Sequence, residues 1–391
     1  MKNSPTLAVL YIAAFCSHIV IGFLILLIPY YADDPQIGAS GSQIGLIVGT
    51  FSLGTGMALV PSGFLSDKLG RRTALIPALV LFSLTPLLYP MAGNAGQLVA
   101  IRIVHGITFG AFLPAASASL IDLTSQGKRG RSLGVFGAAA VLGIALGPLL
   151  GSVLLDTFGF TGVFYICSLI SGLGLMSILM RAGALPQRPA NVDASSDYSW
   201  AWAKSHIGIA ALLIPILITF GSGTIVSYVP SYVENFGIGE WEVGIIFTVM
   251  YLGSALSRVM AGWVSDTVGR RPVILLGFVF SVISLACISF SSQSVLWLGL
   301  AALLFGMGMG AAMTSGVTLL ADVSPSRMRG ITMGMHNTSL NAGLFIGPVI
   351  MGLLVHPCGY ETMFRVCAMS LAGGLILVFT LLCWRYDDDQ A

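Results

Sequence analysis

The chain has 391 residues, of which 56% are apolar and only 9% carry a charge. A soluble domain contains about 25% charged residues, so a water-soluble fold is excluded and we interpret the chain as a polytopic membrane protein. The net charge of +2 gives no indication of a nucleic-acid partner, and none is expected.

A membrane-spanning helix needs roughly 20 mostly apolar residues. The first such stretch is too long for the core of a signal peptide, and no small-residue cleavage site follows it, so we expect it to be retained. In chain order the sequence predicts twelve spans, at residues 7–30, 43–65, 73–92, 97–120, 131–154, 161–182, 205–229, 241–264, 273–291, 295–320, 330–354 and 361–383.

The basic residues predict the orientation of these spans. With the N-terminus in the cytoplasm, every Lys and Arg except Arg102, Arg258 and Arg365 falls on the cytoplasmic side, as the positive-inside rule requires. We therefore expect a multi-pass protein of the cell (inner) membrane with both termini cytoplasmic.

The chain contains an internal repeat. The stretch GFLSDKLGRR at 63–72 returns as GWVSDTVGRR at 262–271, and single glycine, proline and aspartate positions match at the same offset. The repeat predicts an all-α fold of twelve transmembrane helices in two pseudo-symmetric six-helix bundles. We place these bundles at 1–183 and 205–391, the second with a short acidic tail, join them by a cytoplasmic linker at 184–204, and expect a monomer.

Three motifs carry a resemblance to a known family. GFLSDKLGRR resembles the signature of the major facilitator superfamily between spans 2 and 3, and RIVHGITFG at 102–110 resembles its span-4 motif. GIALGPLLG at 143–151 resembles the span-5 motif of its twelve-span drug:proton antiporter branch. The resemblance covers nearly the whole chain and implies the major facilitator fold, a small-molecule substrate, alternating access and efflux by proton antiport.

The repeated motif predicts a gate at the cytoplasmic end of each half. Gly63 has no side chain and allows the end of span 2 to approach a neighbouring helix. Asp67 can face the N-terminus of a helix, and the resemblance implies that this helix is span 11. Arg71 can pair with Asp122 in span 4. A simple positive-inside anchor is the alternative interpretation of the basic residues. The second half repeats the arrangement against span 5, with Thr267 in place of an expected basic residue, at Gly262, Asp266, Arg270 and Asp322.

Small residues recur at every fourth position of span 5. Gly143, Gly147 and Gly151 form a ridge that permits close helix packing, and Pro148 weakens the helix locally. The ridge serves packing alone, or it also seals the bundle and bends between states.

Polar residues inside the spans predict a substrate and proton cavity between the halves. Arg102 is costly in a bilayer and is expected to face the interior, whereas Arg258 is interpreted as part of the cytoplasmic hinge. For each histidine an interhelical hydrogen bond is the alternative. The predicted cavity residues are His18, Arg102, His105, Tyr228, Tyr251, His336, Asn337 and Asn341.

No Asp or Glu lies deep in any predicted span. His is the remaining deep group that titrates near neutral pH. The proton is therefore carried by one of these histidines or by an acid at the outer rim, or transport is not coupled to protons. The embedded basic groups favour neutral or anionic substrates over cations. The outer-rim candidates are Asp33, Asp34 and Glu234.

The sequence shows no catalytic constellation and no metal or cofactor motif, so we expect no enzyme activity, no cofactor and no metal. We interpret the protein as a secondary active transporter that exports a small organic molecule, a drug or a metabolite, by proton antiport. The alternatives are an importer or facilitator of an organic anion and a lipid flippase.

Overall fold

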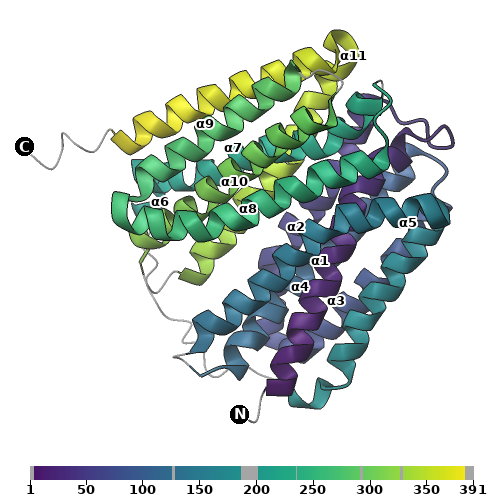
Figure 1. The fold of residues 1–391 in the computed structure, drawn as a ribbon. Helices are drawn as coiled ribbons and strands as arrows, with labels where there is room; N and C mark the ends of the chain where they lie inside the picture. Colours follow the sequence, from purple (N-terminus) through teal and green to yellow (C-terminus); the bar gives the residue numbers. More distant parts are fainter. Residues whose placement is uncertain are drawn as a thin grey trace, which may run out of the picture. The chain divides into compact units, whose positions relative to one another are not determined.

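The computed structural model describes residues 4–125, 128–185, 201–234, 236–290, 294–325 and 329–383, and the regular structure of these ranges is helical. Most of the predicted linker and the acidic tail lie outside the described residues. The elements (Figure 1) are α1 (Ser4–Asp33), α2 (Gly41–Leu69), α3 (Arg71–Leu84), η1 (Thr85–Met91), α4 (Ala95–Leu123), α5 (Arg129–Leu179), η3 (Ala182–Ala184), α6 (Ala201–Lys204), α7 (His206–Glu234), α8 (Glu240–Val268), α9 (Arg270–Ser289), α10 (Val295–Val323) and α11 (Arg329–Cys383).

Ten helices in the described ranges are long and apolar enough to cross a membrane. Two are too long for one crossing, because their apolar parts have 49 residues in α5 and 53 in α11. At 1.5 Å per residue these lengths are about 74 and 80 Å, against a hydrocarbon core of about 30 Å. Each is interrupted by a glycine outside the helical region, Gly159 (φ 64°) and Gly359 (φ 73°). Divided there, α5 and α11 contribute two spans each, which is consistent with the twelve predicted spans.

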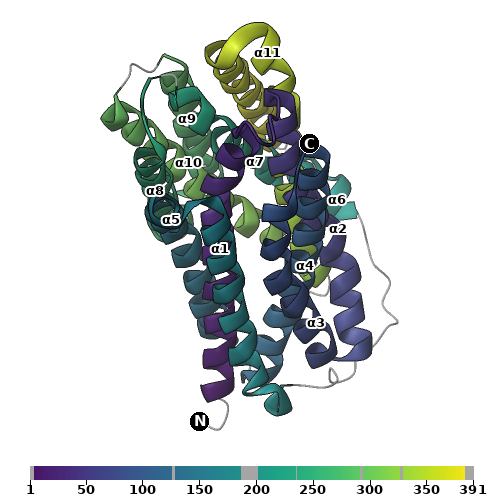
Figure 2. The ribbon, with the colours of Figure 1, turned by 90° about the vertical axis from the view of Figure 1, so that its right-hand side faces the viewer.

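The chain forms two compact units. Unit 1 consists of Met1–Ser40 and Thr50–Ala194, and unit 2 of Gly41–Gly49 and Ser195–Ala391. In unit 1, α1 lies along α5, and α3 packs on α4 and α5 (Figure 2). In unit 2, α7 packs on α11 in the same way, and α9 packs on α10 and α11. The sequence repeat is therefore also a repeat of helix packing.

Matched glycines bring equivalent helices into close contact in the two units. A Cβ on Gly106 of α4 would lie 2.0 Å from the Phe51 carbonyl oxygen of α2, and a Cβ on Gly306 of α10 would lie 1.9 Å from the Met250 carbonyl oxygen of α8. No larger residue fits these positions without separating the helices. Small residues at helix contacts are the usual means of close packing in membranes.

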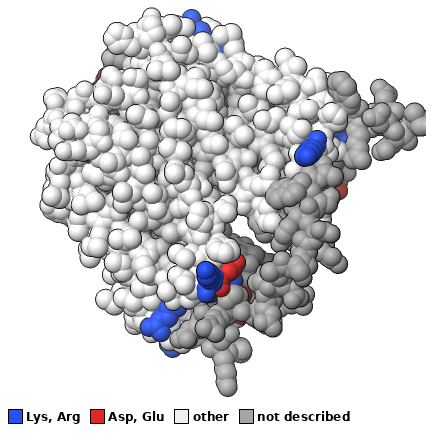
Figure 3. All heavy atoms as spheres, turned by 180° about the vertical axis from the view of Figure 1, so that it is seen from behind, with Lys and Arg blue, Asp and Glu red and all other residues white. Residues whose placement is uncertain are grey.

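Large apolar side chains are exposed along the helices. Phe64, Leu169 and Leu256 are 69%, 65% and 70% exposed, and on the face shown in Figure 3 charged side chains occur only in a few small groups. Soluble proteins rarely expose apolar surface so extensively. We therefore expect these faces to contact lipid.

Candidate functional site

The first copy of the charged motif is built around Arg71, the first residue of α3. Its Nε donates to Asp122 Oδ2 on α4 at 2.9 Å, and its Nη1 contacts Asp67 and donates to Ser66 Oγ, at 3.3 Å, both on the last turn of α2. The Arg71 side chain is only 9% exposed, against 50% for Asp67 and 28% for Asp122. The predicted Arg71–Asp122 pair is confirmed, and the guanidinium ties the ends of three helices together.

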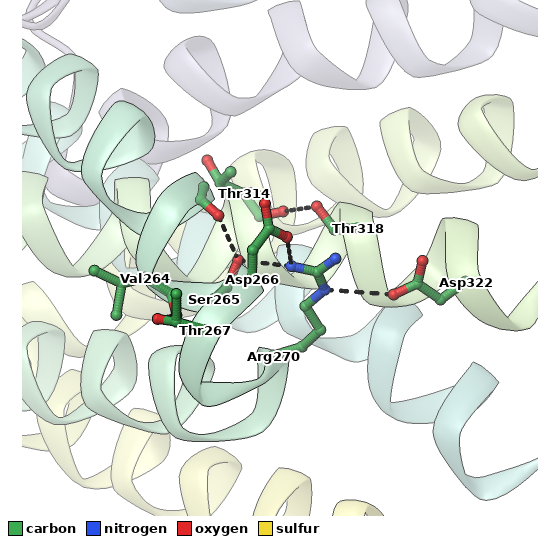
Figure 4. Close-up of polar contacts among 9 residues, drawn as sticks. Val264, Ser265, Asp266, Thr267, Arg270, Thr314, Thr318 and Asp322 are labelled. Carbon is green, nitrogen blue, oxygen red and sulfur yellow. Dashed lines mark hydrogen bonds and ion pairs between the residues drawn. The ribbon is translucent and has the colours of Figure 1, made fainter.

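The second copy repeats this arrangement around Arg270 (Figure 4). Its Nη1 donates to Ser265 Oγ at 3.0 Å and contacts Asp266, and its Nε lies 3.4 Å from Asp322 Oδ2 on α10. Arg270 is 24% exposed and Asp322 is 54% exposed. The predicted Arg270–Asp322 pair is confirmed, but it is longer and more exposed than its counterpart. Thr267 donates its hydroxyl hydrogen to the Val264 carbonyl.

Sequence reasoning missed the role of a glycine in each motif. Gly70 (φ 97°, ψ 151°) is the single residue between α2 and α3. Gly269 (φ 90°, ψ 164°) is the single residue between α8 and α9. Only glycine populates this backbone region readily. These glycines make the sharp connection that places Arg71 or Arg270 beside the acid four residues before it. Their presence in both copies of the motif was the available signal.

The close approach predicted for Gly63 stays a prediction, since the described contacts at the first glycine of each motif are ordinary ones. A Cβ on Gly63 would have its nearest described neighbour, Pro114 Cβ, at 3.8 Å, which is an ordinary contact. A Cβ on Gly262 would meet no described atom within 4 Å. The close approach of α2 to α4 occurs further along, at Gly106, and the helices leave room for a side chain at Gly63.

The glycine ridge of α5 fits against α1. A Cβ on Gly147 would lie 2.4 Å from Gly22 Cα, and one on Gly143 would lie 2.8 Å from the Ile19 backbone nitrogen. At Gly151 the nearest atom, Leu27 Cδ1, is 3.2 Å away and belongs to a flexible side chain. The ridge therefore packs two backbones together. A role of the ridge and Pro148 in bending between states stays a prediction.

Arg102 and His105 lie in an aromatic cluster within unit 1. His105 is completely buried, its Nδ1 lies 3.0 Å from the Tyr89 hydroxyl, and its Nε2 is buried without a partner among the described residues. The Arg102 guanidinium lies 4.6 Å from the centre of the Phe51 ring and also interacts with Tyr89, a favourable cation–π arrangement. Sequence reasoning missed Tyr89, which lies in η1.

His18 is also buried, with 7% of the residue exposed. Its Nδ1 lies 2.7 Å from the Ala14 carbonyl oxygen, and its ring packs edge-on against Phe109 at 5.2 Å between centres. A carbonyl oxygen only accepts hydrogen bonds, so Nδ1 carries the hydrogen and Nε2 is the nitrogen that can take up a proton. The cavity role of His18 stays a prediction.

Tyr228 is completely buried in unit 2. Its hydroxyl donates to the Pro348 carbonyl oxygen at 2.6 Å, and the Gly41 carbonyl oxygen is a second possible acceptor for the same hydrogen at 3.1 Å. A Cβ on Gly45 would lie 2.0 Å from the same hydroxyl oxygen. Tyr228 therefore holds the start of α2 against α7 and α11 within this unit, and its predicted contact with substrate stays a prediction.

The other predicted cavity residues of unit 2 lie on α8 and α11. His336 is 8% exposed and lies within electrostatic reach of Arg258, whereas the Asn341 amide donates to the Asn337 carbonyl oxygen at 2.8 Å within α11. Tyr251 lies two turns before Arg258 on α8. Arg258 itself donates to Ser254 Oγ at 3.4 Å. The interpretation of Arg258 as part of the hinge stays a prediction.

Comparison with known proteins identifies the family. A family model described as Major Facilitator Superfamily matches residues 10–239 and 211–390. An uncharacterized MFS-type transporter of Methanocaldococcus jannaschii is 26% identical over 96% of this chain and 98% of its own length. A homologue of the multi-drug resistance efflux pump PmrA in Lactococcus lactis is 25% identical over 92% of this chain and 88% of its own length.

Two further proteins extend this comparison. The multidrug resistance protein MdtG of Klebsiella pneumoniae is 24% identical over 93% of this chain and 90% of its own length. The solved structure of the nucleoside transporter NupG superposes with a TM-score of 0.83 at 13% identity, over 96% of this chain and 99% of that one. At this identity the structural likeness concerns the fold alone.

Proposed function

Because the chain belongs to the Major Facilitator Superfamily and is a membrane transport protein, we propose that it exports a small organic molecule in exchange for protons by alternating access. Export is supported by the span-5 glycine motif and by two relatives, one named as a homologue of a multi-drug resistance efflux pump (25% identity) and one as a multidrug resistance protein (24% identity). We place both termini in the cytoplasm, as the basic residues predict.

The observation that carries this proposal is the duplicated charge group at the α2–α3 and α8–α9 connections. Each group joins an arginine to two carboxylates on neighbouring helices. Alternating access needs contacts that form and break reversibly, at a cost of a few kcal/mol. The free energy of a partly exposed ion pair is of this size. Ion pairs that only supported a fixed structure would not be needed in both halves.

We propose His18 as the proton carrier. The described spans offer histidines rather than acids at depth, and the Nδ1–H of His18 is held by Ala14, which fixes the ring and leaves Nε2 as the acceptor. Histidine titrates near neutral pH. His105 is the second candidate, although its Nδ1 is engaged by Tyr89 and aromatic rings surround it.

Import or facilitated passage of an organic anion is the second candidate function. Arg102 and Arg258 both lie within helices that are long and apolar enough to cross a membrane, and Arg258 takes part in none of the described ion pairs. A net positive interior favours an anionic substrate over a cation.

The test uses the purified protein in liposomes with an imposed pH gradient and a panel of drugs and metabolites. We expect gradient-dependent movement of at least one compound. Asp67→Asn should slow this movement while the amount of inserted protein stays the same. Glu361→Gln is the matched control, because this acid pairs with Arg365 at 3.4 Å outside the motif and is 58% exposed. Movement without a gradient would favour facilitation, and an unimpaired Asp67→Asn variant would remove the gate.

A further inference from the structure

Unit 2 contains an embedded cation without a carboxylate partner. Arg258 lies near the middle of α8, and its Nε donates to Ser254 Oγ at 3.4 Å. Among the described residues no Asp or Glu pairs with it. The next acid along α8, Asp266, is about 12 Å away along the helix axis and is occupied by Arg270. A guanidinium does not lose its charge in a protein, so Arg258 keeps a full positive charge here.

A second polar group, on α11, lies within electrostatic reach of this cation. His336 is 8% exposed and lies within the electrostatic reach of Arg258. Its Nδ1 is buried and has no hydrogen-bond partner among the described residues. Buried polar groups in folded proteins are nearly always paired, and this nitrogen is available for a hydrogen bond to a bound molecule.

The surface of α8 that carries Arg258 offers further donors. Tyr251, Ser254 and Arg258 follow one another at helical spacing and therefore share a face. Together with His336 the cluster contains a phenol, a hydroxyl, an imidazole and a guanidinium. This set is rich in donors and carries a net positive charge. It suits a carboxylate or phosphate oxygen, which a guanidinium binds with two parallel hydrogen bonds.

We propose that the cluster of Tyr251, Ser254, Arg258 and His336 in unit 2 binds an anionic oxygen group, a carboxylate or a phosphate ester, of the transported molecule. The inference rests on the proposed function, since it names the substrate class of a transporter. It also predicts that neutral compounds of the same shape bind more weakly. Unit 1 does not repeat the cluster, because the residue that corresponds to His336 in unit 1 is Phe136.

The test measures direct binding to the purified full-length protein by calorimetry. The probes are benzoate, octanoate and phenyl phosphate, with benzamide and octanamide as neutral counterparts. We expect at least one anion to bind wild-type protein more tightly than the neutral probes, and Arg258→Gln to weaken this binding at least tenfold. Arg258→Lys keeps the positive charge but cannot form the two parallel hydrogen bonds of a guanidinium. Its affinity for the anion should lie between those of the wild type and Arg258→Gln.

Arg365→Gln is the matched control, because Arg365 is exposed and pairs with Glu361 on α11. It should bind the anion like the wild type. Elution profiles and unfolding midpoints establish that each variant is folded, and His336→Gln provides a second variant whose affinity should also fall. Equal binding of benzamide and benzoate, binding of no anion, or equal losses in Arg258→Gln and Arg365→Gln would overturn the proposal.

The same variants separate this inference from the proposed function. Anion binding that depends on Arg258, without gradient-driven transport in liposomes, leaves the site standing and contradicts antiport. Gradient-driven export of a compound that is insensitive to Arg258→Gln leaves the transporter standing and contradicts the site. The relative affinities of phenyl phosphate and the carboxylates identify which anionic group the site prefers.

Discussion

The two charge groups differ in burial, and the difference predicts unequal effects of the same substitution. Asp122→Asn removes the charged acceptor of Arg71 Nε, which lies 2.9 Å away on a side chain that is 9% exposed. A hydrogen bond to a charged group contributes about 1.5–3 kcal/mol, and an exposed ion pair about 0–1 kcal/mol. Asp122 is 28% exposed, so the pair lies between these two limits. We therefore expect Asp122→Asn to lower the free energy of unfolding by about 1–2 kcal/mol.

The assay is a double-mutant cycle of Arg71→Gln and Asp122→Asn, read by equilibrium unfolding in mixed micelles. The cycle isolates the interaction of the pair from the separate effects of each substitution. Asp322→Asn is the matched variant in unit 2, where the ion pair is 3.4 Å long and Asp322 is 54% exposed, and its effect should be clearly smaller. Equal effects in the two units, or no coupling between Arg71 and Asp122, would refute the reasoning from burial.

Three other expectations follow from the packing and hydrogen bonds. Gly147→Ala should lower the unfolding midpoint, because its Cβ would lie 2.4 Å from Gly22 Cα and overpacking costs about 1–3 kcal/mol. Gly151→Ala should cost less, because its Cβ would lie 3.2 Å from Leu27 Cδ1 and 3.3 Å from Phe23 Cα; equal losses would contradict this account of the ridge. Tyr228→Phe should destabilise unit 2, because it removes the hydroxyl that donates to a buried backbone carbonyl, and an unchanged unfolding midpoint would count against it. His18→Gln should flatten the pH dependence of transport measured in liposomes while substrate still binds, and an unaltered pH profile would leave His18 only a structural role.

The long periodicities of the chain are the features that sequence reasoning recovers well. Apolar stretches of the length of a bilayer and a repeat at a constant offset predict the helices and their duplication, because both depend on composition over many residues. The Arg71–Asp122 pair was predictable as well, since both residues lie near the ends of predicted spans and both recur in the second half.

Features that depend on one backbone angle or one contact distance were not predictable. Gly70 looked like part of a basic anchor, and only its φ of 97° shows why glycine stands there. Gly63 looked like a contact position, yet its neighbour lies at an ordinary 3.8 Å. Helix ends were also misjudged, since α2 continues to Leu69 and carries Asp67 on its last turn rather than in a loop. A terminal turn of helix is polar in this chain and leaves no apolar signal.

The positions where the repeat fails are informative about function. The two units share their packing glycines and their charge groups, which any duplicated bundle needs to fold and to move. They do not share their embedded basic residues: Arg102 corresponds to Ala302, and His336 corresponds to Phe136. Such groups are costly in a membrane, so duplication alone gives no reason to keep a different set in each half. On the function proposed above, recognition of the transported molecule supplies that reason, because each unit can recognise a different part of it.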